Sequence, residues 1–280
     1  MNAAHWLSEF QKTLTPYYSS GEAREITFRV LEAITNQNRI QLLAQNTTFS
    51  AKQNQTIVQY LQRLRQHEPV QYVMGYTYFD DLKITVSPAV LIPRPETAEL
   101  VYLVYERIKQ QANISILDCC TGSGCIALLI KKLIPESTVM GWDISLESLA
   151  IARQNAQQLQ LSVDFSQVDL LSGMYPKTTV DVIISNPPYV PASEKHTIMP
   201  HVVDYEPNIA LFSPETDPII FYRYLILLAQ EQLSPNGFVA IEHHYTQQET
   251  LINLFQENKF SSVLPFNDQF GEKRFIIASL

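Results

Sequence analysis

Apolar residues recur at helical intervals through residues 1–71, where the alternation typical of strands is absent. Ile26, Val30 and Ile34 form one such series, and a serine and a glutamate ahead of it have the spacing of a capping box at a helix N-terminus. A second serine, three positions before a glutamine, opens a similar run at 50–64. Glycine is almost absent here, so the pattern predicts a compact unit of helices.

From residue 72 onward the pattern changes. Apolar residues at 76–79 and 82–86 flank two adjacent aspartates, which predicts a β-hairpin. Segment 91–96 holds two prolines, and because proline has a fixed φ and no backbone N–H, this predicts a stiff, non-helical connector. A helical series of apolar residues follows at 100–108.

Beyond this connector, segments with strand character alternate with segments of helical periodicity. We expect strands at 114–117, 138–142, 162–168, 180–184 and 238–241, and helices at 126–133, 146–159, 219–233 and 247–257. Such alternation predicts an α/β domain with a mostly parallel, doubly wound sheet. The last two expected strands, 260–266 and 275–278, have no helix between them and should pair antiparallel.

Composition and charge narrow the functional classes. The 280 residues are 46% hydrophobic and 17% charged, an ordinary globular composition that excludes a disordered chain. No stretch approaches the ~18 uninterrupted apolar residues of a membrane span, and positions 1–10 lack the basic start and apolar core of a signal peptide. We therefore expect a cytoplasmic protein with no membrane partner. The net charge of −8 argues against a dedicated nucleic-acid binder without excluding a local basic patch.

The three cysteines, Cys119, Cys120 and Cys125, are clustered in one short segment. An odd, clustered set is a poor disulfide framework, and its spacing does not match the paired spacings of a zinc site. We interpret these cysteines as small buried apolar residues of a protein in a reducing compartment, and we expect no metal.

Three of the expected strands end in residues suited to ligand binding, which in an open parallel sheet occurs at the carboxyl ends of strands. The first such end holds Gly122 and Gly124, two of only eight glycines in the chain. Glycine lets the backbone bend sharply and approach a ligand, and the helix that follows offers free N–H groups. An ordinary tight turn is the alternative, because the spacing of Gly122, Gly124 and Ala127 is by itself weak evidence for a dinucleotide site.

Asp143 ends the next expected strand, shortly beyond this glycine turn. A carboxylate about 20 residues beyond such a turn commonly binds the two ribose hydroxyls of a nucleotide. Capping of the following helix is the alternative role, which Ser145 fills equally well. Together the turn and the acid indicate an adenosine-containing cofactor, without separating a nicotinamide nucleotide from S-adenosylmethionine.

The third strand end carries Asn186-Pro187-Pro188-Tyr189. The side-chain oxygen of Asn186 and the backbone carbonyl of Pro187 can both accept hydrogen bonds from one NH₂ group. Two fixed acceptors stabilise the pyramidal nitrogen whose lone pair attacks a methyl sulfonium, and the prolines reduce the reorganisation that the reaction requires. Tyr189 can stack on a flat substrate group. A proline-rich turn capped by Asn186 is the structural alternative.

At this point the chain resembles the HemK/PrmC family, the release-factor glutamine methyltransferases, from its helical part to its last strand. The resemblance rests on Glu68-Pro69-Val70-Gln71-Tyr72, Val90-Leu91-Ile92-Pro93-Arg94-Pro95-Glu96-Thr97, Asp118 with 121–124, Asp143-Ile144-Ser145, 186–189, and Asp204-Tyr205-Glu206-Pro207 with Ala210-Leu211-Phe212. The Pro-Arg-Pro-Glu-Thr segment is much more specific than the Asn-Pro-Pro-Tyr loop, which nucleic-acid methylases share.

The resemblance implies that S-adenosylmethionine is used to methylate the side-chain amide nitrogen (N5) of the glutamine in the Gly-Gly-Gln motif of peptide chain release factors. It also implies a helical substrate-recognition domain over 1–71, a β-hairpin linker over 72–95 and a seven-stranded, Rossmann-like methyltransferase domain over 96–280. We expect release factors as protein substrates and no nucleic-acid substrate. The sequence carries no clear oligomeric signal, and we expect a monomer.

By motif position, the resemblance also assigns the site residues. Cys120, Thr121, Gly122, Ser123 and Gly124 should hold the methionine part of the cofactor, Asp143 its ribose, and Asp169 and Leu170 its adenine. Asn186 should border the cofactor and, with Pro187 and Pro188, orient the substrate amide, and Tyr189 should pack beside that amide. Arg94 and Glu96 belong to the substrate side, with a salt-bridged hinge as the alternative. Phe79 should either cover the cofactor or belong to the core.

Two positions depart from the family pattern. The family usually has glycine where Cys120 stands, and a side chain there should crowd the cofactor or disfavour a backbone with positive φ. After the late strand the family tends toward Glu-Ile-Gly, whereas this chain has Glu242-His243-His244. Neighbouring side chains on an extended chain point in opposite directions, so we expect no metal ion shared by the two histidines.

Other functions remain open from the sequence. A nucleic-acid amino-methyltransferase acting on adenine N6 or guanine N2 would use Asn186 similarly, on a base extruded from its stack. The acidic charge balance and the Pro-Arg-Pro-Glu-Thr segment favour the protein substrate. A catalytically silent cofactor-binding module is disfavoured by the intact Asn-Pro-Pro-Tyr loop, and a nicotinamide oxidoreductase would leave that loop unexplained.

Overall fold

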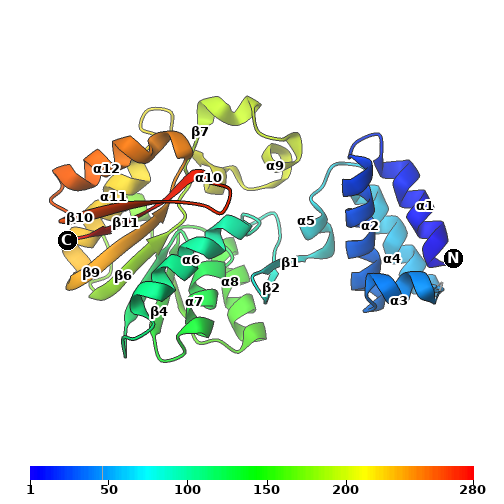
Figure 1. The fold of residues 1–280 in the computed structure, drawn as a ribbon, viewed down its shortest axis with the longest axis horizontal. Coiled ribbons are helices and arrows are strands. Elements are labelled where there is room, and N and C mark those ends of the chain that lie inside the picture. Colours follow the sequence, from blue (N-terminus) through cyan, green and yellow to red (C-terminus); the bar gives the residue numbers. More distant parts are fainter. Residues whose placement is uncertain (46) are drawn as a thin grey trace. The chain divides into compact units, whose positions relative to one another are not determined.

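The computed structural model describes residues 1–45 and 47–280 of the chain. Within them the chain divides into two compact units (Figure 1). Unit 1 comprises Met1–Tyr76 and Met199–Tyr205, and unit 2 comprises Thr77–Ile198 and Glu206–Leu280. None of the described helices is long and apolar enough to cross a membrane.

Unit 1 is built of helices around an apolar core, as its sequence pattern predicts. Its helices are α1 (Ala3–Leu14), α2 (Ser20–Thr35), α3 (Arg39–Ala44), α4 (Ala51–Leu64), α5 (Val70–Met74) and α9 (Pro200–Tyr205). The capping box at the start of α4 is present. The Ser50 side chain accepts from the Gln53 backbone N–H, and the Gln53 side chain accepts from the Ser50 backbone N–H. Short α9 joins this unit from far along the chain, where the Tyr205 hydroxyl donates to the Gln66 carbonyl at 2.6 Å.

The expected hairpin is formed by β1 (Tyr76–Phe79) and β2 (Leu82–Thr85). Its turn contains Asp80 in the left-handed region, at φ 54°, a conformation that aspartate tolerates. The side chain of Asn155 joins β2 to the following domain by accepting from the Thr85 backbone N–H at 2.7 Å and donating to the Thr85 carbonyl at 3.1 Å.

Unit 2 is an α/β domain whose seven-stranded sheet lies between two layers of helices (Figure 1). Its strands are β3 (Ser115–Cys119), β4 (Thr138–Asp143), β5 (Asp164–Gln167), β6 (Val180–Ser185), β9 (Leu233–Glu242), β10 (Ser262–Asn267) and β11 (Lys273–Ser279), with a separate pair β7 (Val190–Pro191) and β8 (Phe212–Ser213). Its helices are α6 (Pro95–Ile108), α7 (Cys125–Leu133), α8 (Leu146–Leu159), α10 (Asn208–Leu211), α11 (Ile220–Gln232) and α12 (Gln248–Glu257). Helices α6, α7 and α8 cover one face of the sheet, and α11 and α12 cover the other.

The strand order is β10-β11-β9-β6-β3-β4-β5. The pairs β6–β9, β3–β6, β3–β4 and β4–β5 are parallel, and β11 pairs antiparallel with both β9 and β10. The expected doubly wound, mostly parallel sheet with an antiparallel end is therefore confirmed. The chain adds β4 and β5 on one side of β3 and then continues with β6 and β9 on its other side. In open α/β sheets, ligands bind beside the carboxyl ends of the strands at such a change of side.

The main core of unit 2 lies between the sheet and the helices α11 and α12. The fully buried Tyr222 and Phe255 come from these helices, and Ile183 and Val239 come from the strands β6 and β9 beneath them. Burial on both faces explains why the central strands read as near-continuous apolar runs in the sequence.

Candidate active site

The three strand ends predicted to carry the site are the turn at 120–124, Asp143 and the segment 186–189. They lie close together because β3 is hydrogen-bonded to both β4 and β6. Cys119 at the end of β3 pairs with Trp142 of β4 and with Ser185 of β6. The segments that follow these residues therefore leave the same edge of the sheet and line one cavity of about 190 Å³. Of the residues predicted for the site, the cavity is lined by Arg94, Cys120, Thr121, Gly122, Ser123, Asp143, Asp169, Leu170, Asn186 and Pro188.

The turn between β3 and α7 departs from ordinary backbone conformation at three positions. Cys120, Gly122 and Gly124 have φ of 61°, 55° and 80°. A Cβ atom at Gly124 would lie 3.0 Å from the Phe165 ring, so this glycine is needed for both its conformation and its lack of a side chain. Cys120 occupies the left-handed region with a side chain, which confirms the positive φ expected where the family has glycine.

Asp118 lies directly behind this turn and is completely buried. Its Oδ2 accepts from the Thr121 hydroxyl at 2.5 Å and from the Ala127 backbone N–H at 3.2 Å. Its Oδ1 is buried with no hydrogen-bond partner among the described residues. Burial raises the pKa of this carboxyl to about 7. The two hydrogen bonds favour the charged form and lower the pKa, but burial has the larger effect.

Asp143 links two backbone segments of the site. Its Oδ2 accepts from the Gly122 N–H at 2.8 Å, and its Oδ1 accepts from the Ser145 N–H at 2.9 Å. Burial raises the pKa of this carboxyl, and the backbone hydrogen bonds oppose that rise. The Ser145 side chain caps α8 by accepting from the Ser148 N–H at 3.1 Å, so capping does not require Asp143.

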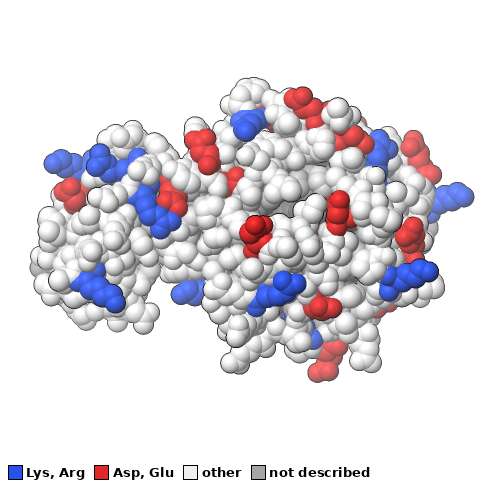
Figure 2. Space-filling view, turned by 180° about the vertical axis from the view of Figure 1, so that it is seen from behind, with Lys and Arg blue, Asp and Glu red and all other residues white. Residues whose placement is uncertain are grey.

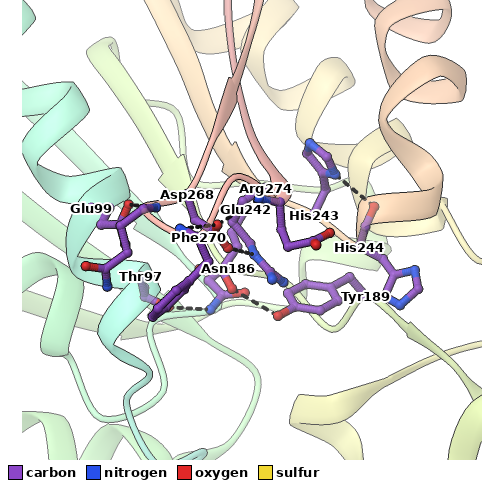
Figure 3. Close-up of polar contacts among 12 residues, drawn as sticks. Thr97, Glu99, Asn186, Tyr189, Glu242, His243, His244, Asp268, Phe270 and Arg274 are labelled. Atoms are coloured by element: carbon purple, nitrogen blue, oxygen red, sulfur yellow. Dashed lines mark hydrogen bonds and ion pairs between the residues drawn. The ribbon is translucent and has the colours of Figure 1, made fainter.

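Asn186, in the segment after β6, lines the cavity. Its side-chain amide is held by a series of hydrogen bonds (Figure 3). The Asn186 side-chain nitrogen donates to the Thr97 hydroxyl at 3.0 Å, and this hydroxyl donates to Oε2 of Glu242 at 2.7 Å. The Tyr189 hydroxyl donates to Oε1 of Glu242 at 3.0 Å, and the Tyr222 hydroxyl donates to the backbone carbonyl of Glu242 at the same distance. Since the Asn186 nitrogen is engaged, its carbonyl oxygen is left to accept from a bound group.

The proline-rich connector ahead of α6 is fixed by Glu206, whose side chain is 1% exposed. This carboxylate accepts from the Arg94 guanidinium at 2.6 Å and from the Ile92 backbone N–H at 3.0 Å. The salt bridge expected as the alternative role of Arg94 is therefore present, and Arg94 also lines the cavity, while its place on the substrate side stays a prediction. Pro95 then occupies the first turn of α6, where its missing N–H costs nothing.

Several predicted site residues lie outside the lining of this cavity. Phe79 is 1% exposed and belongs to the core, so the structure favours the second of the two roles expected for it and corrects the first. Gly124, Pro187 and Tyr189 belong to the site segments, but none of them lines the cavity. The half-buried Glu96 likewise lies outside the lining, and its place on the substrate side stays a prediction.

The two histidines after Glu242 are held by different contacts. The Nδ1 atom of the fully buried His243 lies 2.9 Å from the His244 carbonyl, and burial lowers the pKa of His243 to about 4. The Nδ1 atom of His244 contacts the Thr246 hydroxyl at 2.7 Å. Among residues 1–45 and 47–280, no group of three or more ligating side chains is arranged to hold a metal ion.

Comparison with known proteins gives matches along the whole chain. The PrmC N-terminal domain matches residues 5–75, and the methyltransferase small domain matches residues 101–204. A release factor glutamine methyltransferase of Bacteroides thetaiotaomicron is 39% identical, over 85% of this chain and 85% of its own. Those of Flavobacterium psychrophilum and Streptococcus pneumoniae are each 33% identical, over 97% and 99% of this chain and 97% and 98% of their own.

The chain belongs to the release factor glutamine methyltransferase family. Solved structures of lower identity share the fold of this family. They include the ribosomal protein L11 methylase of Lactobacillus delbrueckii, at 22% identity and a TM-score of 0.51 over 70% of this chain and 84% of that one. They also include the hMettl16 catalytic domain in complex with a MAT2A 3'UTR hairpin, at 15% identity and a TM-score of 0.54 over 82% of each chain.

Sequence reasoning about this family member missed three residues that fix its site. Thr97 and Glu206 were recognised only as parts of longer segments, and Glu242 only as the first residue of a segment whose next two residues depart from the family pattern. Glu242 could have been found, because it ends β9 and so lies at the same edge of the sheet as the other predicted residues. The pairing of Thr97 with Glu242 joins positions 145 residues apart and has no signal in the linear sequence.

Proposed function

We propose that the protein methylates the side-chain amide nitrogen of the glutamine in the Gly-Gly-Gln motif of peptide chain release factors, using S-adenosylmethionine. The observation that carries this proposal is the position of Asn186, which lines the cavity while its side-chain nitrogen donates to Thr97, so that its carbonyl oxygen is left to accept from a bound group. A carbonyl acceptor in this place suits a substrate NH₂ group. Membership of the family supplies the class of protein that carries the glutamine.

The residues of the cavity fit S-adenosylmethionine. Each oxygen of Asp143 accepts one backbone hydrogen bond, and since a carboxylate oxygen can accept two, both have capacity left for ribose hydroxyls. Asp169 and Leu170 line the same cavity, where we place the adenine, and the turn at 120–124 lies on the side where we place the methionine part.

When bound, S-adenosylmethionine supplies a methyl group on a positively charged sulfur. The protein's part is to hold the amide nitrogen of the substrate and to stabilise the charge that develops there. Asn186 accepts from this nitrogen, which localises its lone pair and favours the positive form of the nitrogen. The carbonyl of Pro187 is the second acceptor expected from the sequence, although Pro187 does not line the cavity. The salt bridge of Arg94 with Glu206 holds the connector at the rim of the cavity, so that these groups need little rearrangement.

Replacing Asp143 by alanine should weaken S-adenosylmethionine binding at least about tenfold, because hydrogen bonds to a charged group are each worth about 1.5–3 kcal/mol. Isothermal titration calorimetry measures this directly. Asp164→Ala is the matched control, since this aspartate is exposed at the start of β5 and should leave the affinity unchanged. Equal affinities for Asp143→Ala and wild type would contradict the ribose assignment.

Replacing Cys120 by glycine should tighten S-adenosylmethionine binding by a few-fold, because the Cys120 side chain lines the cavity on a left-handed backbone. Cys120→Ala separates the two causes, since it removes the sulfur and keeps the Cβ atom that the backbone disfavours. Calorimetric affinities that do not differ between wild type and Cys120→Gly would show that this side chain does not crowd the cofactor.

A nucleic-acid substrate is the competing proposal. On the face of unit 2 drawn in Figure 2, Lys and Arg side chains are interspersed with Asp and Glu side chains, and the described residues form no continuous basic surface there. A release factor needs no such surface, whereas a nucleic acid is held mainly by cations along its phosphates.

The test offers both substrate classes to one preparation. Purified protein is incubated with methyl-labelled S-adenosylmethionine and either unmodified release factor or total RNA and DNA. We expect label in the release factor alone. Label confined to nucleic acid would leave the proposed role of Asn186 intact and overturn the proposed substrate.

We also propose that the helical domain over 1–71 contacts the release factor away from its Gly-Gly-Gln motif, since the described lining of the cavity is built from residues of unit 2. Release-factor affinity of a chain without residues 1–71 measures that contribution. An affinity equal to that of the full chain, with S-adenosylmethionine still bound, would contradict it.

A further inference from the structure

A buried chain of hydrogen bonds stands behind the amide that faces the cavity (Figure 3). We call it the Glu242 network; its members are Asn186 after β6, Thr97 in the first turns of α6, Glu242 at the end of β9, and Tyr189. Glu242 is 1% exposed and Thr97 is 2% exposed, so the hydrogen bond between them is shielded from water, whereas Asn186 and Tyr189 are half-buried at the ends of the network.

The directions of these hydrogen bonds follow from the two oxygens of Glu242, which both accept, Oε2 from Thr97 and Oε1 from Tyr189. The single hydroxyl hydrogen of Thr97 therefore points to Glu242. The Thr97 oxygen is then free only to accept, and the group that approaches it from Asn186 must be the NH₂ end of the amide. The carbonyl end is thereby fixed as the end that remains for the cavity.

Several contacts hold Glu242 in place. Burial raises the pKa of this carboxyl, and the hydrogen bonds from Thr97 and Tyr189 and the positive charge of Arg274 offset only part of that rise. Arg274 is itself held by Asp268, which lies 3.2 Å from its Nε atom. The Tyr222 hydroxyl holds the end of β9 through the Glu242 carbonyl.

The orientation matters because the two ends of an asparagine amide have nearly the same shape and opposite hydrogen-bonding character. After a half-turn of the amide, Asn186 would present NH₂ to the NH₂ group of a substrate glutamine, and two donors would face each other. It would instead suit the oxygen of a glutamate. The network therefore distinguishes an amide substrate from a carboxylate.

We propose that Glu242 and Thr97 are positioning residues, which fix the amide of Asn186 with its carbonyl toward the substrate and so make the site select glutamine. This inference rests on the proposed function for the identity of the substrate. Neither residue needs to touch the substrate nitrogen; both act through Asn186.

The test compares Thr97→Val, which keeps the shape and removes the hydroxyl, with Thr97→Ser, which keeps the hydroxyl. We expect Thr97→Val to lower kcat for the release factor about 10–100-fold, the range seen when groups that orient metal ligands are removed. Thr97→Ser should recover most of this loss, and calorimetric affinity for S-adenosylmethionine should stay unchanged in both. Thr27→Val is the control for losing a buried hydroxyl, because Thr27 donates only to the Ala23 carbonyl within α2.

A double-mutant cycle separates positioning from a merely structural role. In the Asn186→Ala background, Thr97→Val should lower kcat no further, because the amide that Thr97 orients is gone. The same fold-loss in both backgrounds, wild-type kcat in Thr97→Val, or failure of Thr97→Ser to recover activity would each overturn the inference.

A second readout does not depend on the substrate. The side-chain NH₂ signals of Asn186 in the NMR spectrum, assigned by their disappearance in Asn186→Ala, should exchange slowly with water in wild type and faster in Thr97→Val. Unchanged exchange would overturn the inference even if the release factor proved not to be the substrate. Wild-type protein that leaves the release factor unmethylated would overturn the proposed function alone.

Discussion

Replacing Asn186 by alanine should lower the rate of methyl transfer to the release factor about 10²–10³-fold, the loss that follows when one transition-state hydrogen-bond partner is removed from other enzymes. The affinity for S-adenosylmethionine should remain close to that of wild type, because Asp143 and the turn at 120–124 make separate contacts to the same cavity. Single-turnover kinetics with saturating cofactor measures the rate, and calorimetry measures the affinity.

The matched control is Asn258→Ala. Asn258 also donates through its side-chain nitrogen, to the Leu254 carbonyl at 2.8 Å at the end of α12, and it does not line the cavity. This variant should keep the wild-type rate. An Asn186→Ala protein that is folded and turns over at nearly the wild-type rate would show that the amide does not hold the substrate.

Replacing Arg94 by methionine should lower the free energy of unfolding by about 3 kcal/mol, because it leaves the carboxylate of Glu206 buried without its cation. The Glu206 side chain is 1% exposed, so this carboxylate cannot exchange its partner for water. Arg94 itself is 32% exposed, which places the expected loss at the lower end of the range for buried pairs. Urea unfolding followed by tryptophan fluorescence measures the change.

Arg223→Met is the control for this prediction. Arg223 pairs with Asp217 at 3.0 Å in the same unit, but their side chains are 49% and 31% exposed, so its loss should cost about 1 kcal/mol or less. The double variant Arg94→Met with Glu206→Gln should regain part of the stability, since no unpaired charge is then buried. Equal losses for Arg94→Met and Arg223→Met would contradict the role of the pair in fixing the connector.

The sequence predicted well those helices and strands whose bounds follow from the spacing of their apolar residues. The helix expected at 146–159 was found as Leu146–Leu159, since both its apolar face and its serine cap are visible in the sequence. Strand β9 was expected at 238–241 and begins instead at Leu233, because Leu233 pairs with Val180 before an irregular stretch that includes the polar Asn236, and regular pairing with β6 resumes at Phe238. Helices α9 and α10 are too short to show a helical period, and they were missed.

The candidate site was predictable to the extent that it follows from strand ends. The turn at 120–124, Asp143 and Asn186 follow adjacent parallel strands, and the sheet register brings them together as expected. Thr97 and Glu206 reach the site from the connector and from a segment far along the chain, so only the folded structure shows their contacts. The sequence therefore predicted most of the strand-end residues that line the cavity, and the structure revealed the hydrogen-bond partners that hold them.

The most direct test of the account is to locate the methyl group in a release factor treated with this protein and S-adenosylmethionine, using tandem mass spectrometry of the peptide that contains Gly-Gly-Gln. We predict one added methyl group on the side chain of its glutamine with wild-type protein, and almost none in the same time with Asn186→Ala. A methyl group found only on other residues of the release factor, or on the glutamine at equal rates with both proteins, would contradict the account.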